Sequence, residues 1–201
     1  MVTAIYGGTF NPPHLGHEHC LEAVCSEIAP DRIFVLPDRI PPHKSANELV
    51  SGEDRLKMCS LAFEDYKNVT VSDWELKRSG KSYSVITLRH FKEKYPDDEL
   101  YFIMGSDMLL SFESWYCFEE ILQLSGLICV SRSDDDSYLK LQAHAKHLTN
   151  SCGGRIIIVK ADPLEVSSTQ IRKMIANSQD CYCYLNKNVV QYIKDNSLYT
   201  T

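Results

Sequence analysis

Residues 2–17 read VTAIYGGTFNPPHLGH, and this stretch decides the fold. Its first five residues form an apolar run typical of a buried strand. Residues 15–28 then place apolar side chains at helical spacing, and a second apolar run covers residues 32–36. The order strand, helix, strand predicts a βαβ unit, in which the two strands are parallel and the crossover is right-handed.

The rest of the chain repeats this alternation. Residues 37–50 contain three prolines and predict a long loop, and residues 74–79 either extend the sheet or form a loop. Further strands are expected at 68–72, 100–104, 127–131 and 155–159, and helices at 51–64, 83–94, 118–124, 138–148, 168–176 and 188–194. The pattern predicts an α/β fold, a Rossmann-like doubly wound, mostly parallel sheet with helices on both faces. We expect a single domain over residues 1–201, with a small C-terminal helical part from about residue 167.

Composition limits the function. The net charge of −6 argues against a nucleic-acid binder, which usually carries an excess of basic residues. No apolar run is long enough to span a bilayer and no secretory signal is visible, so we expect a cytoplasmic protein without a membrane partner. The eight cysteines include no Cys-x-x-Cys pair, which favours free thiols over disulfides. The sequence leaves open a homo-oligomer.

The strongest chemical pattern is the turn from Gly7 to His17. Two glycines allow a sharp turn and let a phosphate approach the main-chain N–H groups at a helix start. His14 and His17 are three residues apart and can face one side of the first helical turn, with Gly16 leaving room for a nucleobase or ribose. A double glycine alone would be an ordinary strand–helix turn. The combination of two glycines with His-x-Gly-His at a helix start is a much more specific pattern, which few unrelated sequences would show by chance.

Two further segments offer phosphate donors. The loop Pro41-Pro42-His43-Lys44 is stiffened by its prolines and presents a histidine and a lysine, although in isolation it would be taken for a solvent-exposed loop. Ser167 and Gln170 have capping-box spacing, so a helix should start there, with Arg172 one turn in, near Ser168 and Thr169. A capped helix is common, and only its convergence with the first helix start would make a triphosphate clamp.

Two other segments lie where a ligand would be bound. Gly105-Ser106-Asp107 follows the strand at 100–104, and Asp107 could accept bonds from ribose hydroxyls or act as a helix N-cap. Trp115-Tyr116 and the segment Lys81–Ser84 could hold a planar ring by stacking. A tryptophan is more often a core residue than a ligand platform.

The stretch from Gly7 to His17 resembles nicotinate mononucleotide adenylyltransferases, and its His-Leu-Gly-His element resembles the signature of the nucleotidyltransferase superfamily. The resemblance continues across nearly the whole chain. It implies an enzyme of NAD biosynthesis that transfers the adenylyl group of ATP to nicotinate mononucleotide, giving nicotinate adenine dinucleotide and pyrophosphate. It also implies Mg²⁺ held mainly by ATP and waters, with no protein metal ligand.

The resemblance assigns roles residue by residue. His14, His17 and Arg172 are implied to be catalytic. ATP would be bound by Gly7, Gly8, Thr9, Phe10, Gly16, Gly105, Asp107, Arg132, Ser167, Ser168, Thr169 and Ile171. The mononucleotide would be bound by Asn11, His43, Lys44, Tyr83, Ser84, Trp115 and Tyr116. Two positions depart from the family pattern, because Val166 stands where isoleucine is usual and Ser84 where threonine is frequent.

Three alternatives remain open at this point. The same chemistry could act on nicotinamide mononucleotide or phosphopantetheine. A class I aminoacyl-tRNA synthetase shares His-x-Gly-His, but its Lys-Met-Ser-Lys-Ser-like segment and tRNA-binding extension are missing here. A non-catalytic nucleotide sensor would keep the pocket, but all of His14, His17 and Arg172 are present.

Overall fold

The computed structural model describes residues 1–41, 49–131, 135–161, 164 and 166–200, and the statements below concern these residues. A single sheet of six strands runs through the molecule, with every neighbouring pair parallel and the order β3-β2-β1-β4-β5-β6. The strands are β1 (Val2–Gly8), β2 (Arg32–Pro37), β3 (Val69–Val71), β4 (Glu99–Gly105), β5 (Gly126–Ser131) and β6 (Ile156–Lys160). The predicted doubly wound α/β fold is confirmed.

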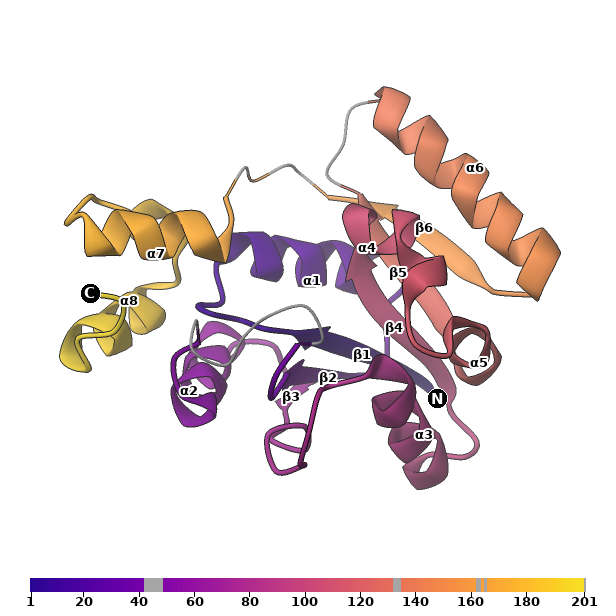
Figure 1. The fold of residues 1–201 in the computed structure, drawn as a ribbon, viewed down its shortest axis with the longest axis horizontal. Coiled ribbons are helices and arrows are strands. Elements are labelled where there is room, and N and C mark those ends of the chain that lie inside the picture. The colour runs from indigo at the N-terminus through magenta and orange to yellow at the C-terminus, as the bar shows by residue number, and fades with distance from the viewer. Residues whose placement is uncertain (42–48, 132–134, 162–163, 165, 201) are drawn as a thin grey trace.

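Eight α-helices accompany the sheet, as Figure 1 shows. They are α1 (Leu15–Glu27), α2 (Gly52–Ala62), α3 (Ser84–Lys94), α4 (Ser106–Leu110), α5 (Phe118–Leu124), α6 (Asp135–Cys152), α7 (Ser168–Ala176) and α8 (Lys187–Asp195). Helices α7 and α8, drawn in yellow tones, lie together beside α1 and α2, whereas α6 lies at the opposite end of the molecule (Figure 1).

Alternation along the strands separates two cores. In β1, Ala4 and Tyr6 face one side and Ile5 the other, because successive side chains of a strand point to opposite faces. The first core fills the space between the sheet and α1, α2, α7 and α8. The second core lies between the sheet and α3, α4, α5 and α6. Each central strand is therefore buried on both faces, as expected for a parallel sheet.

Several boundaries differ from those expected. Helix α4 was not predicted, because a helix of five residues is too short to show a helical period. Helix α6 begins at Asp135 rather than 138 and continues to Cys152 rather than 148. It ends where Gly153 adopts a φ of 71°, a conformation that favours glycine at a helix C-terminus. Residues 74–79 form turns and not a strand.

The described part of the chain contains no helix that is both long and apolar enough to cross a membrane. All eight cysteines are free, as the sequence predicted, and four of them, including Cys59 and Cys129, are buried. Burial raises the pKa of both of these thiols, for Cys129 to about 12, so they are apolar core residues and not nucleophiles.

The strand order indicates which edge of the sheet would bind a ligand. Strands β1 and β4 are neighbours at the centre of the sheet, and the helices that follow them, α1 and α4, pack on opposite faces. In doubly wound sheets this switch point opens a crevice at the carboxyl ends of the two strands. Those ends are Gly8 and Gly105, so the turn from Gly7 to His17 and the segment after β4 lie at the same edge.

Candidate active site

The turn after β1 is made by Phe10 and not by the glycines. Gly7 and Gly8 still pair with Leu36 and Pro37 of β2, whereas Phe10 has a φ of 48° and the Asn11–Pro12 peptide bond is cis. A Cβ on Gly8 would lie 3.0 Å from the Phe10 ring, and one on Gly7 would lie 3.3 Å from the Phe102 ring. The glycines therefore make room for two aromatic rings, which corrects the sharp turn expected of them.

Packing holds Phe10 in this unusual conformation. A left-handed backbone costs a non-glycine residue on the order of 1–2 kcal/mol. The Phe10 ring is only 1% exposed and contacts Tyr6 and Phe63 edge-to-face, with ring centres 5.5 and 6.2 Å away. It also contacts the His17 ring at 5.0 Å. Burial of this ring offsets the backbone cost and couples the turn to the first core.

The two histidines face each other at the start of α1. His14 is the N-cap and His17 lies in the first turn, with ring centres 3.9 Å apart, so the predicted shared side is confirmed. The backbone N–H of His14 donates to Nδ1 of His17 over 3.1 Å. Since Nδ1 is an acceptor there, the neutral His17 ring carries its proton on Nε2. His14 is buried and His17 is half-buried.

Helix α7 begins directly against this turn. The Ser168 hydroxyl donates to the carbonyl oxygen of Pro12 over 2.8 Å. Nη1 of Arg172 donates to the carbonyl oxygen of Asn11 over 2.9 Å, and Nη2 donates to Oγ1 of Thr169 over 3.2 Å. The starts of α1 and α7, separated by about 150 residues in the sequence, therefore meet at one place (Figure 1).

The α7 start itself matches the sequence expectation. Ser167 is the N-cap, its hydroxyl accepts from the Gln170 backbone N–H over 3.2 Å, and the Gln170 side chain accepts from the Ser167 N–H over 2.8 Å. Ile171 is fully buried in the first core, so its side chain anchors α7. The expected capping box is confirmed.

Arg55 of α2 is a residue that the sequence reasoning missed. It is only 2% exposed, and its Nη1 donates to the carbonyl oxygens of Thr9 and Asp38 over 2.9 and 2.6 Å. Burial lowers its pKa, an effect opposed by the Asp38 carboxylate 3.5 Å away. The signal was in the sequence, because Arg55 shares the helical spacing of the buried Met58, Cys59 and Ala62. Arg55 fastens the β1–α1 turn to the loop after β2.

Thr9 has a further contact with that loop. Its hydroxyl donates to Oδ2 of Asp38 over 3.1 Å. Asp38 therefore links Thr9 to Arg55, and the three residues connect the ends of β1 and β2 with α2. This network gives the turn a fixed backbone, which a binding site for a charged ligand requires.

The aromatic segments come together on the other side of the switch point. Tyr83 is the N-cap of α3, Ser84 is the first helical residue, and the Tyr83 ring lies 5.0 Å from the ring of Tyr116. Tyr116 is 59% exposed. The Trp115 ring is half-buried and contacts Phe102 and Phe112 at 5.9 and 5.5 Å. Trp115 is thus partly a core residue, with the second core behind its ring.

Asp107 lies in the first turn of α4, and the N-cap is Gly105. The N-cap role considered for Asp107 is therefore wrong, and its carboxylate is exposed at the end of β4. A Cβ on Gly105 would meet no atom within 4 Å, so open space borders this strand end. The Ser106 hydroxyl donates to the carbonyl oxygen of Val130 over 3.5 Å, which ties the segment to β5.

Three predicted residues, His43, Lys44 and Arg132, lie outside the described part of the chain. Gly16 is described and is buried in the first turn of α1. Among the described residues no group of three or more His, Cys, Asp or Glu side chains could hold a metal ion.

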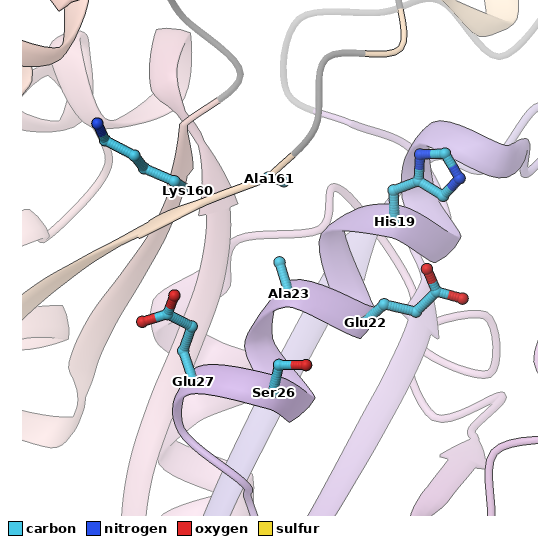
Figure 2. A pocket seen from close by; sticks show the side chains of 7 residues that line it. All are labelled: His19, Glu22, Ala23, Ser26, Glu27, Lys160 and Ala161. Atoms are coloured by element: carbon cyan, nitrogen blue, oxygen red, sulfur yellow. The ribbon is translucent and has the colours of Figure 1, made fainter.

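A separate hollow of about 310 Å³ lies between α1 and β6 (Figure 2). It is lined mainly by His19, Glu22, Glu27 and Lys160, and by none of the predicted site residues. Lys160 extends away from the α1 side chains in Figure 2, and its ammonium lies 4.3 Å from the centre of the Tyr138 ring. Among the described residues of its lining, Lys160 is therefore not directed at the carboxylates of Glu22 and Glu27.

Comparisons with known proteins match nearly the whole chain. A family model described as cytidylyltransferase-like matches residues 5–174. A probable nicotinate-nucleotide adenylyltransferase from Fusobacterium nucleatum is 37% identical over 195 residues, which covers 96% of this chain and 97% of the relative. A probable nicotinate-nucleotide adenylyltransferase from Geobacter sulfurreducens is 35% identical, with 99% and 98% covered.

A solved structure has the same fold. It is the nicotinic acid mononucleotide adenylyltransferase of Plasmodium falciparum complexed with NaAD, with a TM-score of 0.79 and 23% identity. The alignment covers 98% of this chain and 97% of that chain. The strand order and helix placement described above are therefore those of a known architecture.

Proposed function

Because the chain belongs to the cytidylyltransferase-like family and, within it, to the nicotinate-nucleotide adenylyltransferases, we propose that it joins nicotinate mononucleotide to the AMP part of ATP. The products are nicotinate adenine dinucleotide and pyrophosphate, and the reaction is a step of NAD biosynthesis. One observation carries the proposal for the site: the starts of α1 and α7 meet at Asn11 and Pro12.

The reaction needs charge stabilisation more than proton transfer. A phosphate oxygen of the mononucleotide attacks the α-phosphorus of ATP, the new P–O bond forms, and the bond to the β-phosphate oxygen breaks. The nucleophile is already an anion, so no general base is required, and pyrophosphate leaves with the electron pair of the broken bond. Catalysis then depends on holding the two phosphates in line and on stabilising the charge of the transferring group.

The α1 start supplies donors for the triphosphate. A helix N-terminus has backbone N–H groups without intrahelical acceptors and a partial positive charge. His17 adds a directed donor, since its Nδ1 is engaged by the His14 N–H and its proton is on Nε2. In our proposal this Nε2–H and the His14 ring bind triphosphate oxygens, and Gly105 and Asp107 border the nucleoside at the end of β4.

The α7 start supplies the second set of donors. Arg172 is oriented by bonds to Asn11 and Thr169, and two such bonds leave a guanidinium, with five N–H groups, the capacity to bind phosphate. In our proposal Ser168, Thr169 and Arg172 hold the pyrophosphate as it leaves. The Ser168 contact with Pro12 keeps this group beside the α1 start.

The acceptor is assigned to the aromatic side of the switch point. Ser84 is the first residue of α3, where a helix N-terminus favours an anion such as the nicotinate carboxylate. The exposed ring of Tyr116 contacts Tyr83, the N-cap of α3, and in our proposal this ring and the half-buried ring of Trp115 contact the pyridine ring. Asn11 would bind the mononucleotide from the β1–α1 turn, as would His43 and Lys44 from the loop after β2.

We propose that Mg²⁺ enters the site bound to the phosphates of ATP. Magnesium usually keeps several waters and binds substrate phosphates instead of a protein cage. When bound it would neutralise charge on the triphosphate. Because the ion is held mainly by ATP and waters in this proposal, we assign it no protein ligand.

One experiment tests the function directly. The protein is mixed with ATP, Mg²⁺ and either nicotinate or nicotinamide mononucleotide, and the dinucleotide is identified by mass spectrometry. We expect nicotinate adenine dinucleotide and pyrophosphate, with a higher kcat/KM for nicotinate mononucleotide because α3 offers its carboxylate a helix N-terminus. Equal kcat/KM for the two acceptors would contradict the substrate assignment, and absence of any dinucleotide would contradict the activity.

A further inference from the structure

The residues after α8 also contact the β1–α1 turn, in addition to the contacts made by α2 and α7. Ser197 and Tyr199 have φ values of 50° and 64°, and the Leu198 N–H donates to the Ile193 carbonyl over 3.0 Å. This tight turn carries the Tyr199 ring against the first core. The Tyr199 hydroxyl donates to Oδ1 of Asn11 over 2.9 Å, across 188 positions of sequence.

Asn11 is buried and accepts hydrogen bonds at both its side-chain and its backbone oxygen. It is 1% exposed, and its Oδ1 also accepts from the Val50 backbone N–H over 3.4 Å. A backbone N–H can only donate, so the amide atom beside Val50 must be the oxygen, and the Nδ2 group must point the other way. The backbone carbonyl of Asn11 accepts from Arg172, as described above. The orientation of the Asn11 amide is therefore set by Tyr199 and Val50 together.

Tyr199 is suited to act as a constant donor. Burial raises the pKa of its phenol, and the nearby guanidinium groups of Arg172 and Arg55 oppose this effect only in part. The hydroxyl thus keeps its proton throughout the physiological pH range, and Oδ1 of Asn11 always has a partner. A phenylalanine would fill the same space and remove only the hydrogen bond.

We propose that Tyr199 is a positioning residue for the mononucleotide half of the site, because its hydroxyl fixes the Asn11 amide and with it the turn from Phe10 to Pro12. The inference rests on the proposed function, in which Asn11 binds the mononucleotide. Tyr199 itself does not contact the reacting atoms in this account. It acts through Asn11, so its effect should vanish when the Asn11 side chain is absent.

Tyr199→Phe tests the proposal against a matched control. One net hydrogen bond corresponds to about a 3- to 10-fold effect, so kcat/KM for nicotinate mononucleotide should fall by that factor. The loss should come mainly from a higher KM for the mononucleotide, with a smaller change in KM for ATP. Tyr192→Phe is the control, because it also removes one tyrosine hydroxyl, but that hydroxyl donates to Oδ1 of Asp54 over 2.9 Å and not to Asn11. It should leave both KM values unchanged.

A double-variant cycle separates positioning from stability. In an Asn11→Ala background, Tyr199→Phe should cause no further loss of kcat/KM, because coupled residues are not additive. If the two losses multiply, or if Tyr199→Phe alone has wild-type kcat/KM, the inference is wrong. An equal loss for both substrates, together with a lower Tm than that of Tyr192→Phe, would indicate a structural role and would also overturn it. A wild-type protein that makes no dinucleotide would instead refute the proposed function.

Discussion

His17 has a different task at each ring nitrogen. Its Nδ1 accepts from the His14 N–H and so completes the start of α1, while its Nε2 is the donor assigned to the triphosphate. The first task concerns stability and the second concerns catalysis. Substitutions that separate the two nitrogens can therefore separate the two effects.

His17→Ala should lower kcat by about 100-fold or more, the usual loss when one directed transition-state donor is removed. The free energy of unfolding should fall by only about 1 kcal/mol, since what is lost there is a helix cap. His17→Asn keeps an acceptor for the His14 N–H and should recover stability but not turnover. Initial rates and urea denaturation measure the two quantities.

His19→Ala is the control for this pair, because His19 lies on the same helix but lines the hollow between α1 and β6. It should leave kcat unchanged. Near-normal turnover in His17→Ala would remove His17 from the proposed mechanism.

For single residues, the sequence indicated most of the polar residues of the candidate site but not the contacts that hold them in place. The spacing of His14 and His17 and the capping box at Ser167 could be read directly, because both depend on residues three apart. The contacts of Arg55 with Thr9 and Asp38 could not, because they join three separate segments. The role of Gly8 was misread, since the ring of Phe10 that fills the space beside it is visible only in three dimensions.

At the scale of elements, α1 carries a buried carboxyl next to His17. Glu18 is 7% exposed, and its Oε1 has no hydrogen-bond partner among the residues that the structure describes. Burial raises its pKa from the usual 4.5 to about 7, with smaller contributions in the same direction from Glu22 and Asp65, while a hydrogen bond with Asn186, the N-cap of α8, lowers it. The interface of α1 with α8 is therefore sensitive to pH.

The sign of this effect follows from the two pKa values. In the unfolded chain Glu18 loses its proton near pH 4.5, and in the folded protein near pH 7. Between these values the folded state binds more protons, so the free energy of unfolding contributed by Glu18 falls as the pH rises through this window. Glu18→Gln should therefore raise the urea midpoint at pH 8 and leave it nearly unchanged at pH 4.

The exposed Glu27 at the end of the same helix provides the control. Glu27→Gln should change the urea midpoint little at either pH. A Glu18→Gln variant with no gain at pH 8 would show that the carboxylate is accommodated without cost.

Helices and strands could be predicted from the sequence where they contain enough residues to show a helical or strand period. The strands of six or seven residues in the centre of the sheet and helices such as α1 and α3 have clear apolar patterns. Helix α4 has five residues, and its placement depends on β4 ending beside β5. Such short elements are decided by tertiary contacts, which a local pattern does not contain.

For the whole molecule, the parallel doubly wound fold followed from the alternation of strands and helices, but the strand order did not. The order β3-β2-β1-β4-β5-β6 puts the switch point between β1 and β4. The paired residues of β1 and β4, such as Val2 and Glu99, are about 100 positions apart, so no local sequence pattern reveals this pairing. The meeting of α1 and α7 is likewise a result of this topology and of the docking of α7 on the first core.

Ligand binding at that meeting point should stabilise the entire domain. A non-hydrolysable ATP analogue with Mg²⁺, at about 100 times its Kd, should add about 2.7 kcal/mol to the free energy of unfolding. For a chain of this size that corresponds to a Tm increase of about 5–10 °C. Chelating Mg²⁺ with EDTA should remove most of the Tm increase, because the charge of the triphosphate is then not neutralised by the ion.

Differential scanning fluorimetry measures this shift, and AMP, which lacks the β- and γ-phosphates, serves as the control ligand. The same Tm gain with and without Mg²⁺ would contradict the proposed role of the ion. A full gain in Arg172→Met would contradict the role assigned to α7.

The contacts of Ser168 and Arg172 with the β1–α1 turn have a consequence for synthesis on the ribosome. The first strand and helix are made early, but their partners at the turn are 156 and 161 residues further along the chain. In a nascent polypeptide, β1 can pair with β2 long before α7 has been synthesised and the nucleotide site can form. Competence therefore arises late in translation, and fragments released before α7 should be inert towards ATP even when their N-terminal half is folded.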